Sequence, residues 1–134
     1  MTLFKHELQI NERQTMVDIT PQIRHDIEES GIKDGIVVVY CPHTTAGITI
    51  NENADPDVVR DLIYGFEKVY PTRDAAYRHF EGNSHAHMKS STMGASQTLI
   101  LSEGKPILGV WQDVYFCEFA GPRNRSFYVK VLEG

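Results

Sequence analysis

Cysteine is scarce in this sequence. Cys41 and Cys117 are its only two, and their spacing is far from the C-x-x-C pattern of redox and zinc motifs. Both stand in apolar, strand-like stretches, so we expect buried, reduced thiols that pack as small hydrophobic side chains. The alternative is a catalytic thiolate at Cys41, which would need a cationic environment and has His43 two residues away.

A long apolar run and an excess of basic residues are also missing. No run approaches the roughly 20 residues that span a bilayer, and Lys5 and Glu7 interrupt the N-terminal stretch, which argues against a signal peptide. Acidic residues outnumber basic ones by 18 to 13, whereas nucleic-acid-binding proteins need a basic excess. We therefore expect a cytoplasmic protein with no membrane or nucleic-acid partner. The basic pair Arg123 and Arg125 suits one small anion better than a duplex.

What is present is an ordinary globular composition. The chain has 134 residues, of which 41% are hydrophobic and 23% charged. No internal repeat is visible. These properties predict a single domain over residues 1–134.

Several segments carry strand signals. Residues 3–10 alternate between apolar and polar, which predicts a half-buried strand, and a hairpin at 11–14 is expected to lead into a strand at 15–19. The β-branched run at 35–41 predicts a strand covered on both faces. Further strands are expected at 46–51, 97–101, 107–119 and 127–132.

Two stretches carry the start and stop signals of helices. The first is expected to begin with Thr20 as N-cap and Pro21 in the first turn, and to end at Gly31. The second is expected to be capped by Asn53 or Asp55. Its buried face is expected to comprise Val58, Val59, Leu62, Ile63, Phe66 and Val69.

These elements predict an α+β fold. Consecutive late strands joined by short turns predict antiparallel pairing. The expected architecture is a largely antiparallel β-sheet core, two-layered and sandwich-like, with two packed helices.

Residues 71–96 lack strong hydrophobic periodicity, and long irregular stretches in small domains tend to be functional. They contain His79, His85 and His87. In a helix, His85 and His87 would point about 200° apart, whereas in a strand they would share a face. Ser84 as a possible N-cap and a later glycine favour the helix, so we expect His87 to be functional and His85 to lie on the surface.

His43 follows a predicted buried strand at a junction where proteins often place chemistry. Imidazoles are common ligands of divalent transition metals, and catalytic zinc sites frequently use three protein ligands plus water. The alternative is that none of these histidines binds metal. His6 and His25 stand in ordinary strand and helix settings, and we interpret both as structural.

Other polar segments have two interpretations each. Lys89, Ser90 and Ser91 suit a phosphate or carboxylate, or form a solvated face. The amide-rich stretch at 51–57 is partly explained by helix capping. The Trp111–Gln112 pair either faces a substrate or packs at a sheet edge or subunit contact.

Four spaced segments together resemble the YjbQ-like family, also called secondary thiamine-phosphate synthase proteins. The segments are residues 42–57, His79 with 81–83, residues 86–91 with Gly94, and residues 108–112. The resemblance implies a small β-rich domain, a homotrimer, and a pocket between subunits. It also implies histidine at positions 43, 79 and 87, a variable residue at 85, and threonine where this chain has Val110.

The activity that the resemblance implies is weak formation of thiamine phosphate from a pyrimidine pyrophosphate and a thiazole phosphate. Departure of pyrophosphate calls for a divalent metal or basic groups. We therefore expect a metal-assisted, transferase-like enzyme that acts on a phosphorylated or otherwise anionic small molecule, with thiamine synthesis as a side activity.

The residues expected to carry this function fall into three sets. A divalent ion, zinc or magnesium, would be held by His43, His79 and His87, and Glu81 and His87 would act in catalysis. The substrate would contact Thr44, Asn51, Asn53, Lys89, Ser90, Ser91, Gln112 and Arg123. The alternatives are a non-catalytic trimer that binds a metabolite or metal, and purely structural histidines.

Overall fold

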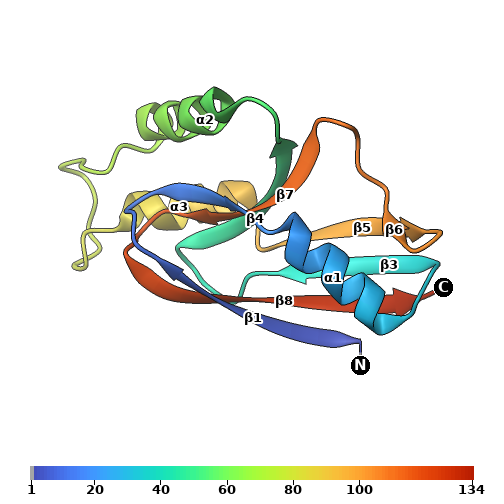
Figure 1. Cartoon of the computed structure of the whole chain (residues 1–134). Helices are drawn as coiled ribbons and strands as arrows, with labels where there is room; N and C mark the ends of the chain where they lie inside the picture. The colour runs from blue at the N-terminus through green and yellow to red at the C-terminus, as the bar shows by residue number, and fades with distance from the viewer. Residues whose placement is uncertain (1) are drawn as a thin grey trace.

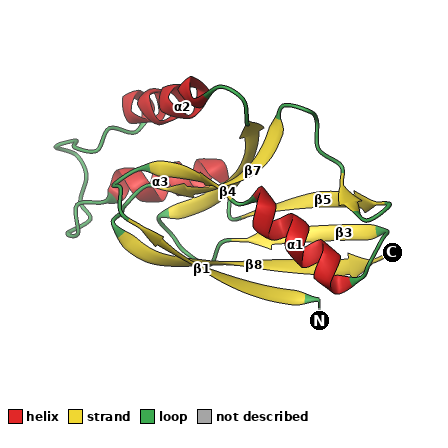
Figure 2. Ribbon diagram, in the orientation of Figure 1, coloured by secondary structure: helices red, strands yellow, loops and turns green. Residues whose placement is uncertain are grey.

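The computed structural model describes residues 2–134 as two antiparallel β-sheets with three helices (Figures 1 and 2). The five-stranded sheet has the order β1 (Leu3–Ile10), β8 (Arg123–Glu133), β3 (Gly35–Tyr40), β5 (Ser96–Ser102) and β6 (Lys105–Pro106). The three-stranded sheet has the order β2 (Thr15–Asp18), β7 (Gln112–Glu118) and β4 (Ala46–Glu52). The expected α+β class with antiparallel sheets is confirmed.

The main core lies where the inner faces of the two sheets and helix α1 (Thr20–Ser30) meet. Val37 and Val39 of β3, Phe116 of β7, and Ile19 and Ile23 at the start of α1 are all completely buried. Residues of β1 alternate as expected, with Phe4, His6, Leu8 and Ile10 on the more buried side. Burial of the apolar side chains of this core supplies most of the driving force for folding.

Strand β3 departs from the prediction that both its faces are covered. Ile36 and Tyr40 keep 40% and 46% of their surface exposed, whereas Val37 and Val39 between them keep none. A continuous apolar run shows that both faces are apolar, but within one chain only one of them is covered. The outer face of the five-stranded sheet is therefore partly bare hydrocarbon.

Helix α1 begins one residue earlier than expected, at Thr20 instead of Pro21. Ile19 holds the N-cap position, and the Thr20 amide donates to the Asp18 carboxylate over 2.9 Å. The Thr20 hydroxyl instead accepts the amide of Val114 at 2.8 Å, which ties the helix to β7. Gly31 ends the helix at φ 70°, a left-handed conformation that glycine adopts without strain.

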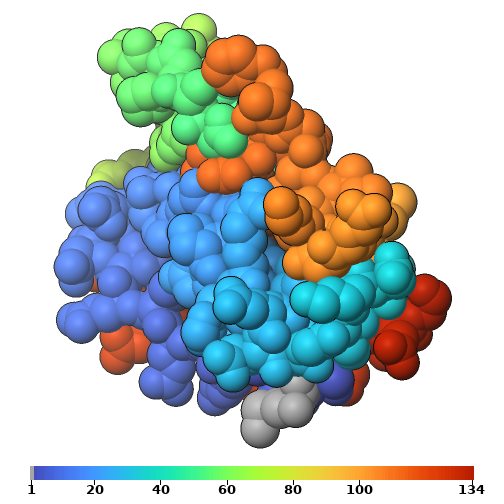
Figure 3. Space-filling model, turned by 45° about the vertical axis from the view of Figure 1, so that its right-hand side comes forward, coloured from blue at the N-terminus to red at the C-terminus, as the bar shows by residue number. Residues whose placement is uncertain are grey.

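Helix α2 (Pro56–Val69) is capped by Asp55, whose carboxylate accepts the amide of Asp57 at 2.9 Å. This confirms one of the two expected caps. None of its residues is fully buried, so its apolar stripe is covered only in part. Figure 3 shows α2 standing out from the main body beside the loop that precedes β7.

Helix α3 (Ser84–Met93) is a third helix, so the expected number of two is wrong by one. It is the helix that Ser84 and Gly94 favoured, although Asn83 rather than Ser84 occupies the N-cap position. The irregular stretch is thereby shortened to residues 70–83, which loop out between α2 and α3 (Figure 1).

One predicted connection and one predicted strand boundary are wrong. Strand β1 pairs with β8 and β2 pairs with β7, so residues 11–14 cross between sheets instead of forming a hairpin. The expected strand at 107–119 begins only at Gln112, whose side-chain oxygen accepts the amide of Gly109 at 2.8 Å and closes a turn.

None of the helices described within residues 2–134 has both the length and the apolar character needed to cross a membrane.

Candidate functional site

Three histidines from two separate segments of the chain line one cavity of about 400 Å³. It lies where the loop after β3, the segment that leads into α3, and the start of β8 meet. Its walls include six of the residues that the sequence singled out: His43, Thr44, His79, Glu81, His87 and Arg123. The fold thus gathers the expected imidazoles, carboxylate and guanidinium at one place.

His43 is held as a neutral imidazole. Its Nε2 accepts the backbone amide of Ser126 at 3.0 Å, so in the neutral ring the proton is assigned to Nδ1. Burial, together with the positive charge of Arg125, lowers the pKa of His43 below its usual value. His43 therefore offers one N–H donor and carries no charge at neutral pH.

His79 and His87 form an edge-to-face pair in the wall of the cavity. Their ring centroids lie 5.3 Å apart with an interplanar angle of 86°. The Nε2 of His79 is 3.9 Å from a carboxylate oxygen of Glu81, and both side chains are partly exposed. This wall combines two imidazoles and a carboxylate in reach of solvent, as proton transfer requires.

The three histidines share a cavity but do not form a ligand set. Within residues 2–134, no three His, Cys, Asp or Glu side chains lie close enough together to hold one metal ion. The Nε2 lone pair of His43 is already committed to Ser126, and its Nδ1 carries a proton. The residues of one chain therefore do not fit a three-histidine metal centre.

A buried ion pair underlies the cavity. The Nε of Arg125 donates to a carboxylate oxygen of Glu118 at 2.7 Å, and its Nη2 donates to the Thr45 hydroxyl at 2.8 Å. Glu118 is completely buried and Arg125 is 6% exposed. Sequence reasoning missed Glu118, although a glutamate that ends the apolar run Val-Tyr-Phe-Cys was a signal for a buried partner.

Arg123 is the less committed of the two arginines. It is exposed, and its Nε donates to the carbonyl oxygen of Ala120 at 2.8 Å. Among residues 2–134 its two terminal nitrogens have no hydrogen-bond partner and it forms no salt bridge. A guanidinium with free terminal donors is suited to bind an oxyanion.

Lys89 lies away from the cavity and is not available to an anion as the sequence suggested. Its side chain is completely buried, and Nζ contacts a carboxylate oxygen of Glu67 at 2.8 Å, His85 Nδ1 at 2.8 Å and Gln14 Oε1 at 3.3 Å. These three bonds use all three ammonium protons. Burial would raise the pKa of Glu67, but hydrogen bonds from Lys89 and Thr72 outweigh it and lower the pKa to about 2.

His85 is buried and only 6% exposed, so its expected place on the surface is wrong. An ammonium can only donate, so the Nδ1 of His85 accepts from Lys89 and Nε2 carries the ring proton. Burial, together with the charge of Lys89, lowers the pKa of His85. Sequence reasoning did not pair His85 with Lys89, which stands four residues later on the same helical face.

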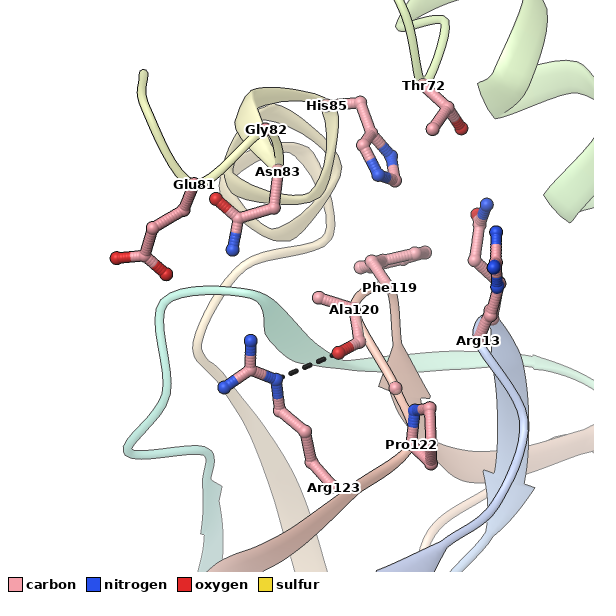
Figure 4. Close-up of a pocket in the computed structure, with 12 residues that line it drawn as sticks. Arg13, Thr72, Glu81, Gly82, Asn83, His85, Phe119, Ala120, Pro122 and Arg123 are labelled. Carbon is pink, nitrogen blue, oxygen red and sulfur yellow. Dashed lines mark hydrogen bonds between the residues drawn. The ribbon is translucent and has the colours of Figure 1, made fainter.

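A second cavity, of about 470 Å³, adjoins the first. The two share Glu81, Asn83 and Arg123 as lining residues. Figure 4 shows His85 reaching into this second cavity from α3, with Arg13 at the right of the view and Arg123 at the lower left.

The remaining expected contacts lie elsewhere. Ser90 is buried and donates to the carbonyl of Ala46 at 2.6 Å, and Ser91 is exposed on α3 outside the cavity. Asn51, Asn53 and Gln112 lie at the opposite end of β4 from the cavity. There the side chain of Asn53 bonds the backbone oxygens of Val110 and Gln112, both at 3.4 Å. Within a single chain these residues stabilise a loop.

The cysteines and the remaining histidines behave largely as expected. Cys41 and Cys117 are free and buried, and burial raises the pKa of both thiols, that of Cys117 to about 12. This argues against a catalytic thiolate at Cys41. His6 pairs with the buried Asp26 at 2.6 Å, a structural contact, whereas His25 lies on the surface of α1.

The sequence profile described as UPF0047 protein YjbQ-like matches residues 5–134. The chain belongs to this family. UPF0047 protein YugU of Bacillus subtilis is 53% identical over 126 residues, which cover 94% of this chain and 96% of that protein. A UPF0047 protein of Methanocaldococcus jannaschii is 55% identical over 130 residues, or 97% of this chain and 94% of that protein.

Solved structures of family members have the same fold. A conserved YjbQ/UPF0047 protein of Clostridium acetobutylicum superposes with a TM-score of 0.94 at 51% identity, covering 96% of this chain and 99% of that one. A YbjQ-like protein of unknown function from Sulfolobus solfataricus also gives 0.94, at 29% identity, covering 98% and 96% of the two chains. The family resemblance and the fold that it implied are therefore confirmed. The names of these relatives give no activity, so the thiamine-phosphate label remains a prediction.

Proposed function

We propose that the cavity between His43 and His87 binds the phosphate or pyrophosphate group of a small molecule and catalyses transfer chemistry at that group. The observation that carries this proposal is Arg123, which lines the same cavity as the neutral His43 and whose terminal guanidinium nitrogens have no hydrogen-bond partner among residues 2–134. Both groups donate hydrogen bonds, and together they suit an oxyanion. His87, His79 and Glu81 line the same cavity and are suited to proton transfer.

The reaction that the family resemblance implies fits these roles. In thiamine-phosphate formation, the bond between the pyrimidine methylene carbon and the pyrophosphate oxygen breaks, and the thiazole nitrogen donates the electron pair of the new bond. Arg123 and His43 would stabilise the negative charge that grows on the departing pyrophosphate. The cavity is partly open and has few fixed donors, which accords with a weak side activity on these substrates.

Zinc or magnesium has no step in this proposal. The pair His79 and His87 supplies two imidazoles, whereas catalytic zinc sites usually have three protein ligands. A metal site would need a further donor from a neighbouring subunit. Elemental analysis of protein purified without a histidine tag tests this point, and stoichiometric zinc in active protein would contradict it.

The trimer implied by the resemblance is part of the same proposal. Ile36 faces Ile100 on one neighbouring strand and Leu132 on the other, and their side chains are 40%, 61% and 41% exposed. An apolar row of this kind on the outer face of a sheet is typical of a subunit contact. Light scattering should give three times the chain mass of 15.2 kDa, and Ile36→Lys should give monomers.

Turnover with synthetic pyrimidine pyrophosphate and thiazole phosphate tests the catalytic part. Removal of one donor to a developing oxyanion typically lowers kcat by about 10²–10³-fold, and we expect a loss of that order in Arg123→Ala. His87→Ala should also lose turnover, whereas Arg24→Ala, on α1 away from the cavity, should not. Saturable pyrophosphate binding with no turnover would instead indicate a non-catalytic metabolite-binding protein.

A further inference from the structure

The second cavity has the features of a binding site in its own right. His85 enters it from α3, Arg13 lies across from His85, and Phe119 and Pro122 also line it (Figure 4). The walls thus combine two guanidinium groups and an imidazole with apolar surface. Such a combination is common in pockets for small molecules.

The imidazole of His85 is oriented and its proton placed before any ligand arrives. The ring is more than nine-tenths buried, and its Nδ1 is occupied by the Lys89 ammonium at 2.8 Å. Lys89 is held in turn by Glu67 at 2.8 Å. The Nε2–H of His85 therefore faces the cavity as a fixed donor, and within residues 2–134 it has no hydrogen-bond partner.

The charges around the cavity favour a dianion. Arg13 is exposed, and its side chain forms no salt bridge or hydrogen bond with any residue from 2 to 134, while Arg123 uses only Nε. Two uncommitted guanidinium groups match the charge of a phosphate, which is close to −2 near neutral pH and is spread over three acceptor oxygens. Glu81 lies on the wall shared with the first cavity and carries the single carboxylate of this lining.

We infer that this second cavity binds the phosphate of a phosphate monoester through His85 Nε2–H, Arg13 and Arg123, separately from the cavity of His43 and His87. The apolar part of the ester would lie against Phe119 and Pro122. Because Arg123 lines both cavities, two anionic ligands would meet at its guanidinium. The inference rests on the proposed function only in this shared residue, since Arg13 and His85 do not line the first cavity.

Titration of the native protein with inorganic phosphate, followed by NMR, tests the inference. We expect saturable shifts of the amides of Gly82 and Gly121, which line the second cavity and not the first. Arg13→Ala should lower the phosphate affinity that these shifts report by about ten-fold or more, as loss of a hydrogen bond to a charged group usually does. Arg13 is exposed, so this variant is expected to fold normally.

His85→Asn is the sharper variant. Its side-chain oxygen can still accept from Lys89 near the position of Nδ1, but the Nε2–H donor is lost. It should weaken phosphate binding at Gly82 and Gly121 with little change in stability, whereas His87→Ala should leave that binding intact and impair only the first cavity. Equal phosphate affinity in native protein, Arg13→Ala and His85→Asn would overturn the inference. So would shifts confined to Thr44 and His87.

Discussion

Two groups of charged side chains meet around the start of α3, and they differ in how completely they are paired. In the enclosed group, Arg125 and Lys89 each bond two or more side chains, and both are buried. In the open group, Arg123 makes one bond to a backbone oxygen, and His79 lies 3.9 Å from Glu81. Burial of a charge is costly unless it is paired. Full pairing thus indicates a structural role, and spare donors at a cavity indicate a binding role.

The largest effect is expected where the enclosed group is broken at Arg125. Arg125→Met would leave the completely buried carboxylate of Glu118 without its partner. Removal of one member of a buried ion pair typically costs about 3–5 kcal/mol of unfolding free energy. Urea unfolding at a fixed protein concentration measures this loss.

Arg123→Met is the matched control for that substitution. It removes an exposed guanidinium two residues away whose one bond is to the carbonyl of Ala120. Surface substitutions of this kind usually change stability by no more than about 0.5 kcal/mol. If both variants lost stability equally, the distinction between the enclosed and open groups would be wrong.

A smaller loss is expected at Lys89. Lys89→Met removes three hydrogen bonds, but Glu67 is 39% exposed and can be rehydrated. We therefore expect a loss of about 1–3 kcal/mol, the range for leaving a polar group without its partner. The pKa of Glu67, now about 2 because of Lys89 and Thr72, should rise toward its ordinary value. Carboxyl NMR titration measures this rise, and Lys68→Met, an exposed change on α2, should leave it unchanged.

The sequence predicted local structure better than it predicted contacts. The bounds of β1 and the cap at Asp55 follow from alternation and from side-chain chemistry that act within a few residues. The pairing of β1 with β8 does not, because residues 11–14 are compatible with either a hairpin or a crossing between sheets. Which of these forms is decided by core packing between segments more than a hundred residues apart.

The candidate site shows the same division. The helical argument correctly separated His85 from His87, but it wrongly placed His85 on the surface. Helix periodicity states which residues share a face and does not state which face meets the body of the protein. The pairing of Arg125 with Glu118 was equally hidden, because the turn between them sets their distance. Gathering of the three histidines in one cavity followed from the family pattern rather than from periodicity.

The smallest expected effect is a dependence of stability on pH, caused by buried histidines. His43 and His85 are neutral in the folded chain because burial, with the nearby Arg125 and Lys89, lowers the pKa of each below 6.5. As pH falls below 6.5, the unfolded chain takes up protons at these positions more readily than the folded chain does. The contribution of these two histidines to the free energy of unfolding should therefore be complete above this pH and decrease below it.

Thermal unfolding between pH 5 and pH 8 should show a lower midpoint at the acid end. The dependence should be shallower in His85→Asn and unchanged in His25→Asn, since His25 is 68% exposed. Equal slopes in the two variants would show that His85 is protonated as easily in the folded chain as in the unfolded one, and it would then belong with the open group.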